Sequence, residues 1–173
     1  MIKAIILDIG GVLLLPKDNR KERHLLDSFK EALILLDSFL KTSPETKEQL
    51  INIYKESTIG AVTKKETLKE MSDILNIKPK ELEQMFHRVY SENIIENIAL
   101  YEKVLELKKR RYKIGILSTQ FHLSKDVLVP KKYYDNFNAL EISCDDHLKK
   151  PDAKSYTLIL GLLNVKPRII ICR

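Results

Sequence analysis

The chain has 173 residues, of which 44% are hydrophobic and 31% are charged, and it carries a formal net charge of +6. This size allows one substantial hydrophobic core with a smaller appended module, and the composition is that of a soluble globular protein. No apolar run reaches the roughly 18 residues that a membrane span needs, and Asp8 interrupts the apolar N-terminus with no signal-peptide cleavage pattern after it. The two cysteines, Cys144 and Cys172, show no zinc-binding spacing and suit a reducing compartment. We therefore expect a cytoplasmic protein with no membrane partner.

The densest basic run, KKRRYK at 108–113, falls where a helix is expected to end and a strand to begin. Cations at the end of a helix complement its dipole, so a solvated helix end is the favoured interpretation, with an anion or nucleic-acid patch as the alternative. Because the chain has no recognisable nucleic-acid-binding motif, we expect no nucleic-acid partner.

The first predicted element is a strand at 2–7 (IKAIIL), an apolar run that ends at Asp8 and is soon followed by two glycines. A strand without alternating polar residues is typical of a parallel sheet that is covered on both faces. From 17 to 97 the pattern becomes helical and predicts roughly four helices and no strand, the first of them from the apolar spacing between 25 and 40. This segment is expected to be a helical insert.

Three helix starts within the insert are predicted from local signals. Ser43 and Pro44 form the pattern of an N-cap followed by proline at the first helical position. Thr63 and Glu66 have the spacing of a capping box, and Pro79 opens a further helix.

After the insert, helices and strands alternate. The predicted order is helix 99–110, strand 112–118 (YKIGILS), a helix or loop around Pro130, strand 139–143 (ALEIS), helix 152–163 and strand 168–172 (RIIIC). This order predicts an open α/β sheet, in which ligands bind beyond the carboxyl ends of the strands.

Three polar residues are expected to meet at that end of the sheet. Asp8 ends the first strand, Ser118 ends the second within ILSTQ, and Lys150 lies in HLKKPDAKSY before a helix that begins near a proline. A carboxylate, a hydroxyl and an ammonium group suit an anionic substrate, because the carboxylate can attack while the other two hold oxygens and neutralise charge.

The stretches LDIGGVL, ILS and LKKPD, in this order and with a helical insert between the first two, resemble the first three motifs of the haloacid dehalogenase-like hydrolase superfamily. The resemblance covers nearly the whole chain. It implies a Rossmann-like core at 1–16 and 98–173 and an all-helical cap at 17–97. By this resemblance Asp8 is the nucleophile that forms an aspartyl-phosphate, Ser118 binds a phosphoryl oxygen, and Lys150 stabilises the shared negative charge.

The resemblance also implies a phosphate-binding turn and a metal. Ile9, Gly10 and Thr119 would complete the phosphate-binding residues, with the glycines allowing the backbone to approach the phosphate closely. Mg²⁺ would be held by Asp8 and the carbonyl of Gly10, because oxygen ligands suit a hard ion. The implied function is that of a Mg²⁺-dependent phosphatase acting on a small phosphorylated metabolite.

The sequence departs from the family's pattern at two points. The usual first motif has a second aspartate, the general acid and base, where this chain has Gly10, and losing such a group typically slows catalysis about 10²–10⁴-fold unless the leaving group is good. An acidic pair of the fourth motif should follow the strand at 168–172, and the sequence ends at Arg173. We therefore expect the C-terminal part of the core to be missing and, if this is the whole product, weakened Mg²⁺ binding and turnover. Asp145 and Asp146 are either ordinary loop acids or substitute carboxylates.

Two alternatives to the phosphatase remain open. One is a catalytically inactive or truncated member of the superfamily that acts as a binding module, and the other is a haloacid dehalogenase, because dehalogenases also lack the second aspartate. The histidines show no metal-ligand spacing and are expected at the surface or at a boundary: His24, His87, His122 and His147. The substrate and the oligomeric state are not predicted.

Overall fold

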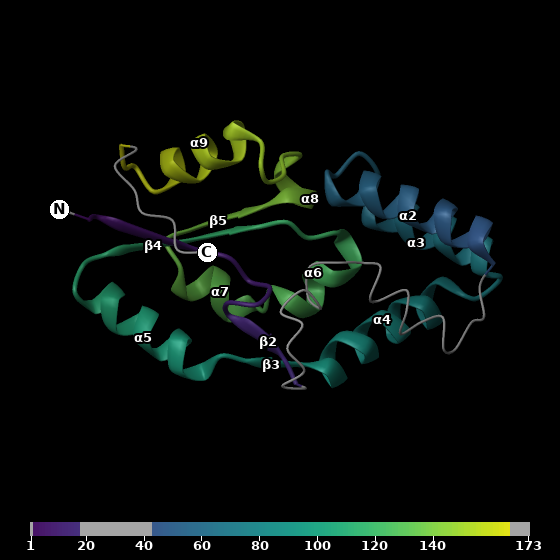
Figure 1. Ribbon diagram of the computed structural model, residues 1–173, viewed down its shortest axis with the longest axis horizontal. Helices are drawn as coiled ribbons and strands as arrows, with labels where there is room; N and C mark the ends of the chain where they lie inside the picture. The colour runs from purple at the N-terminus through teal and green to yellow at the C-terminus, as the bar shows by residue number, and fades with distance from the viewer. Residues whose placement is uncertain (1, 18–42, 167–173) are drawn as a thin grey trace.

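The structure is a computed structural model that describes residues 2–17 and 43–166 (Figure 1). The helix expected at 25–40 and the strand expected at 168–172 lie outside the described residues. Among the residues that are described, no helix combines the length and the apolar character required to cross a bilayer.

Three parallel strands form the central sheet, in the order β1 (Ala4–Leu7), β4 (Lys113–Ser118) and β5 (Ala139–Ile142). Leu7 pairs with Ile116, and Ser118 pairs with Ile142. Because both pairings are parallel, the carboxyl ends of the three strands meet at one edge of the sheet. The predicted α/β architecture with a parallel sheet is confirmed, and each strand lies within the range expected for it.

Helix α9 (Ala153–Leu162) covers one face of the sheet, as Figure 1 shows. The apolar cluster between this helix and the sheet consists of Ala4, Ile6, Leu117, Ile159 and Leu163. Gly115 of β4 lies under α9, and a Cβ atom there would come within 2.9 Å of Leu163 Cδ1. The missing side chain therefore lets the helix approach the sheet closely.

The opposite face of the sheet is covered by α5 (Ile98–Lys109) and α7 (Lys131–Asn136) (Figure 1). The two short helices that follow strand ends are α6 (His122–Leu128) after β4 and α8 (Ser143–Asp146) after β5. A larger apolar core begins on this face and continues into the insert, so the sheet and the insert share buried side chains such as Ile116, Leu50 and Phe86.

The described part of the insert contains helices α2 (Pro44–Thr58), α3 (Lys64–Leu75) and α4 (Pro79–Asn93). All three begin as predicted. The hydroxyl of Ser43 accepts a hydrogen bond from the amide of Thr46 at 3.2 Å. Thr63 and Glu66 form a reciprocal capping box, in which each side chain accepts from the other residue's amide.

The end of the insert differs from the prediction. β2 (Leu14–Pro16) and β3 (Ile94–Glu96) pair as antiparallel strands, so the expectation of no strand between 17 and 97 is wrong at its last residues. The chain leaves the core at β2 and returns at β3, and pairing the two connections satisfies backbone groups that would otherwise be without partners. The β-branched pair Ile94 and Ile95 favours this extended conformation.

The insert and the core are joined next to the carboxyl edge of the sheet. Phe121, between β4 and α6, packs edge-on against Tyr54 of α2 and Phe86 of α4, with ring centroids 5.1 and 5.5 Å apart. Lys64 of α3 forms ion pairs with Glu83 of α4 and with Asp126 of α6. The helices of the insert are therefore fixed to α6 by both apolar and ionic contacts.

The basic run at 108–113 lies between the end of a helix and the start of a strand, which is the position predicted for it. α5 ends at Lys109 and β4 begins at Lys113. The ammonium group of Lys108 donates to the carbonyl of Asn136, and that of Lys113 donates to the carbonyl of Leu163 at 2.7 Å. Two cations of the run thus satisfy carbonyl groups at the ends of neighbouring helices.

Candidate active site

A carboxylate and a hydroxyl group meet at the carboxyl edge of the sheet. Asp8 follows β1 directly and Ser118 is the last residue of β4, the neighbouring strand. The hydroxyl of Ser118 donates to Asp8 Oδ1 at 3.0 Å. The parallel pairing of the two strands therefore joins residues that are 110 positions apart in the sequence.

Lys150 reaches the same carboxylate from the segment between α8 and α9. Its Nζ lies 2.5 Å from Asp8 Oδ2, and the side chains of Lys150 and Asp8 are 26% and 28% exposed. The pair is therefore sheltered but remains open to a ligand from solvent. The three residues that the sequence singled out as catalytic lie together.

The chain turns sharply after Asp8. Gly11 has φ +70°, a conformation that glycine adopts without a steric penalty. The amide of Ile9 donates to Asp8 Oδ1 at 2.7 Å, and the amide of Gly11 donates to the carbonyl of Leu14 at 2.8 Å. The amide of Gly10 makes no hydrogen bond to any described residue, which leaves it available to a phosphoryl oxygen.

The two other residues expected to bind phosphate, Ile9 and Thr119, differ in which of their atoms could reach a ligand beside Asp8. The side chain of Ile9 is fully buried in the core, so only its backbone can contribute. Thr119 follows Ser118 and is half-buried, and its hydroxyl makes no hydrogen bond within the described part of the chain. Its role in binding phosphate stays a prediction.

Behind Ser118 lies a buried polar network that the sequence did not reveal. The side-chain Nε2 of Gln120 donates to Ser118 Oγ at 3.0 Å, and the hydroxyl of Ser124 donates to Gln120 Oε1 at 2.8 Å. Gln120 is 6% exposed and Ser124 is 3% exposed. Because Gln120 donates to Ser118 Oγ, the serine hydrogen is directed to Asp8. The only sequence feature that could have indicated this network is the glutamine two residues after the strand-terminal serine, in ILSTQ.

A second carboxyl group near Lys150 is buried. Glu141 of β5 is 1% exposed, and its Oε1 has no hydrogen-bond partner among the described residues. Burial raises the pKa of Glu141 to about 7, against the opposing effect of the nearby Ser155 hydroxyl; the charge of Asp146 raises it further, and the charge of Lys150 lowers it. This carboxyl group therefore titrates near neutral pH.

The oxygen atoms around Asp8 suit a hard cation. The carboxylate of Asp8 and the carbonyl of Gly10 are the kinds of ligand that Mg²⁺ takes, and among the described residues this carbonyl accepts no backbone hydrogen bond. Asp145 and Asp146 are engaged elsewhere, Asp145 with Lys125 Nζ at 2.7 Å and Asp146 with the amide of Ile142 at 2.9 Å. Neither of these contacts joins the two acids to Asp8, so they give no support to the interpretation of Asp145 and Asp146 as substitute carboxylates at this site.

Comparisons with known proteins point to one family. A family model for haloacid dehalogenase-like hydrolases matches residues 2–172. Among curated proteins, the pyrophosphatase PpaX of Bacillus mycoides is 34% identical over 86 residues, a match that covers 49% of this chain and 40% of the relative. The same protein from Bacillus thuringiensis (strain Al Hakam) is 33% identical over 86 residues, with 49% of this chain and 39% of the relative covered. The matched region thus spans less than half the length of these relatives.

Solved structures show the same fold at low identity. A HAD family enzyme of Bacteroides thetaiotaomicron, solved as a complex with magnesium and inorganic phosphate, superposes with a TM-score of 0.71 at 17% identity, covering 96% of this chain and 81% of the enzyme. A predicted HAD-like hydrolase from Porphyromonas gingivalis superposes with a TM-score of 0.69 at 18% identity, covering 96% and 78% of the two chains.

Proposed function

The chain belongs to the haloacid dehalogenase-like hydrolases, and we propose that it is a Mg²⁺-dependent phosphatase that acts on a small phosphorylated metabolite through an aspartyl-phosphate at Asp8. The observation that carries the proposal is the contact of one partly exposed carboxylate with both Ser118 and Lys150 at the carboxyl edge of the sheet. A carboxylate held by a hydroxyl and an ammonium group can attack phosphorus while both donors stabilise phosphoryl oxygens.

In the proposed first step, an oxygen of Asp8 attacks phosphorus in line with the leaving group. A P–O bond to Asp8 forms, the P–O bond to the leaving group breaks, and the leaving oxygen takes the bonding electrons. Lys150 then neutralises charge on the transferring group, Ser118 donates to one phosphoryl oxygen, and the amide of Gly10 donates to another. In the second step water attacks phosphorus, the bond to Asp8 breaks, and phosphate leaves as the water's proton passes to solvent.

Mg²⁺ bound by the carboxylate of Asp8 and the carbonyl of Gly10 would neutralise negative charge between nucleophile and phosphate. The magnesium complex of the Bacteroides thetaiotaomicron neighbour supports this choice of metal. The insert, which contacts the core next to the site through Phe121, would restrict access to small substrates.

The absence of an acid at Gly10 narrows the choice of substrate. With no side chain there to protonate the leaving oxygen, the enzyme favours substrates whose leaving group departs without a proton, such as phosphoanhydrides and aryl phosphates. The Bacillus relatives are named pyrophosphatases, so inorganic pyrophosphate is the first natural substrate to test.

The test is Mg²⁺-dependent phosphate release from p-nitrophenyl phosphate, phenyl phosphate and pyrophosphate, with Asp8→Asn as the comparison. We expect turnover that Asp8→Asn abolishes, and kcat/KM much higher for p-nitrophenyl phosphate than for phenyl phosphate because the leaving group is not protonated. Equal values for the two esters would show that another residue acts as the acid.

A second candidate, a binding module without turnover, is favoured by the glycine at position 10. It predicts that pyrophosphate or phosphate binds, that Lys150→Met weakens this binding, and that no phosphate is released from any of the three substrates. That result would refute the phosphatase proposal.

A further inference from the structure

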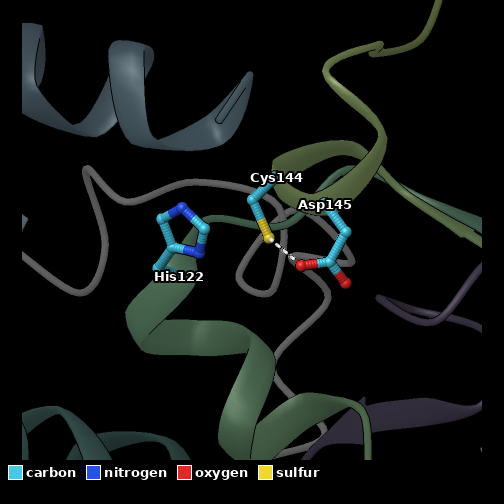
Figure 2. A group of neighbouring side chains, drawn as sticks. All are labelled: His122, Cys144 and Asp145. Atoms are coloured by element: carbon cyan, nitrogen blue, oxygen red, sulfur yellow. Dashed lines mark hydrogen bonds between the residues drawn. The ribbon is translucent and has the colours of Figure 1, made fainter. Parts of the chain in front are cut away.

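A mixed group of metal-ligand side chains lies between the core and the insert, outside the candidate active site. His122 is the first residue of α6, after β4, and Cys144 and Asp145 lie in α8, after β5. One ligand atom from each of the three side chains lies within 4.8 Å of the other two. Figure 2 shows the imidazole, the thiol and the carboxylate facing one another, with Cys144 Sγ 4.0 Å from Asp145 Oδ1.

The donor types select the kind of ion. Sulfur, imidazole nitrogen and carboxylate oxygen together form the ligand set of Zn²⁺ and Co²⁺, whereas Mg²⁺ takes oxygen ligands. Three protein ligands leave one position of a tetrahedral ion open. Cys144 is buried and Asp145 is exposed, so the group can be reached from solvent on the Asp145 side.

The surroundings of His122 already orient its ring as a ligand. Its Nε2 lies 3.0 Å from the carbonyl of Val62, in the segment between α2 and α3. A carbonyl only accepts, so Nε2 carries the hydrogen, and in the neutral ring the lone pair is then on Nδ1. A histidine that donates its other nitrogen to a backbone carbonyl is the usual arrangement at metal sites.

We propose that His122, Cys144 and Asp145 form a second metal site, selective for Zn²⁺ over Mg²⁺, that links the core to the insert. The metal takes the place of the thiol proton of Cys144, which is released to solvent. The metal also displaces the ammonium group of Lys125 from Asp145. In the structure, Lys125 Nζ lies 2.7 Å from Asp145 Oδ1. Because His122 also binds Val62, the loaded site holds the insert against α6.

The test uses Co²⁺ as the probe, in the Asp8→Asn protein so that the active-site carboxylate does not take part. We expect one Co²⁺ per chain, with thiolate-to-cobalt charge-transfer absorption and the visible bands of a tetrahedral ion, bleached by Zn²⁺ but not by excess Mg²⁺. Cys144→Ser should abolish the charge-transfer band, and Cys172→Ser, at the only other cysteine, should retain it. Absence of the band, or its survival in Cys144→Ser, would overturn the proposal.

Two further variants test the other ligands and do not depend on Cys144→Ser being folded. His122→Asn should weaken Co²⁺ binding by at least about tenfold. Lys125→Met removes the competing cation and should strengthen binding, whereas unchanged affinity would show that Asp145 is not a ligand. Zn²⁺ should raise the midpoint temperature of thermal unfolding of the Asp8→Asn protein but not that of the same protein with His122→Asn added. A ligand that binds only the native state stabilises that state.

Discussion

Replacing Glu141 with glutamine should change how the stability of the fold depends on pH. The side chain is 1% exposed, and its Oε1 has no hydrogen-bond partner in the described part of the chain. Burial raises the pKa of Glu141 to about 7 from an ordinary value of 4.5. Glutamine keeps the size and shape of the side chain and cannot become charged, so the substitution isolates the effect of ionisation.

The sign and size of the effect follow from this difference in pKa. Between pH 4.5 and 7 the folded protein keeps a proton on Glu141 that the unfolded chain has already released. The contribution of the protonated Glu141 to the free energy of unfolding is therefore fully present below pH 4.5 and is lost as pH rises through 7. A difference of about 2.5 in pKa corresponds to about 3 kcal/mol, as an upper limit.

The assay is urea denaturation of the wild type and Glu141→Gln at a series of pH values from acid to mildly alkaline. The free energy of unfolding of the variant should exceed that of the wild type by a margin that grows with pH and levels off above pH 7, reaching at most about 3 kcal/mol. Glu102→Gln, at an exposed position on α5, is the matched control and should follow the wild-type profile. Parallel profiles for the wild type and Glu141→Gln would refute the reasoning.

Three further substitutions test other parts of the account. Gln120→Ala should lower kcat for p-nitrophenyl phosphate about five- to tenfold with an unchanged circular dichroism spectrum, because one hydrogen bond that directs the Ser118 hydroxyl is lost; unchanged kcat would remove Gln120 from the site. Thr63→Ala should reduce the free energy of unfolding in urea by about 1 kcal/mol through loss of the capping box of α3, and an unchanged value would show that the cap is not stabilising. Gly60→Ala should destabilise by about 2 kcal/mol, because φ is +64° and the new Cβ would lie 2.5 Å from the carbonyl of Cys144. Gly161→Ala is its control, since the added Cβ meets nothing within 4 Å and the variant should be at least as stable as the wild type.

The residues that could be predicted from the sequence are those whose position follows from a single strand end or helix start. Asp8 and Ser118 end apolar strands, and parallel pairing brings such ends together, so their contact was predictable. The starts of α2, α3 and α4 were equally accessible, because an N-cap depends on neighbours within four residues.

The features that the sequence did not reveal depend on how separate loops come together. β3 pairs with β2 across a long insert, and nothing within either short segment indicates the partner. His122 and Cys144 are 22 positions apart and meet only because the loops after β4 and β5 lie at the same edge of the sheet. Spacing rules for metal ligands apply within one helix or hairpin, so the histidine appeared to be an ordinary boundary residue.

The central claim is that Asp8 becomes phosphorylated during turnover. The direct measurement is acid quenching of the protein during reaction with Mg²⁺ and p-nitrophenyl phosphate, followed by proteolysis and mass spectrometry. We predict one phosphoryl group on the peptide that contains Asp8, present during turnover, lost once substrate is exhausted and absent from Asp8→Asn. Turnover without phosphorylation of this peptide, or phosphorylation at another residue, would contradict the account.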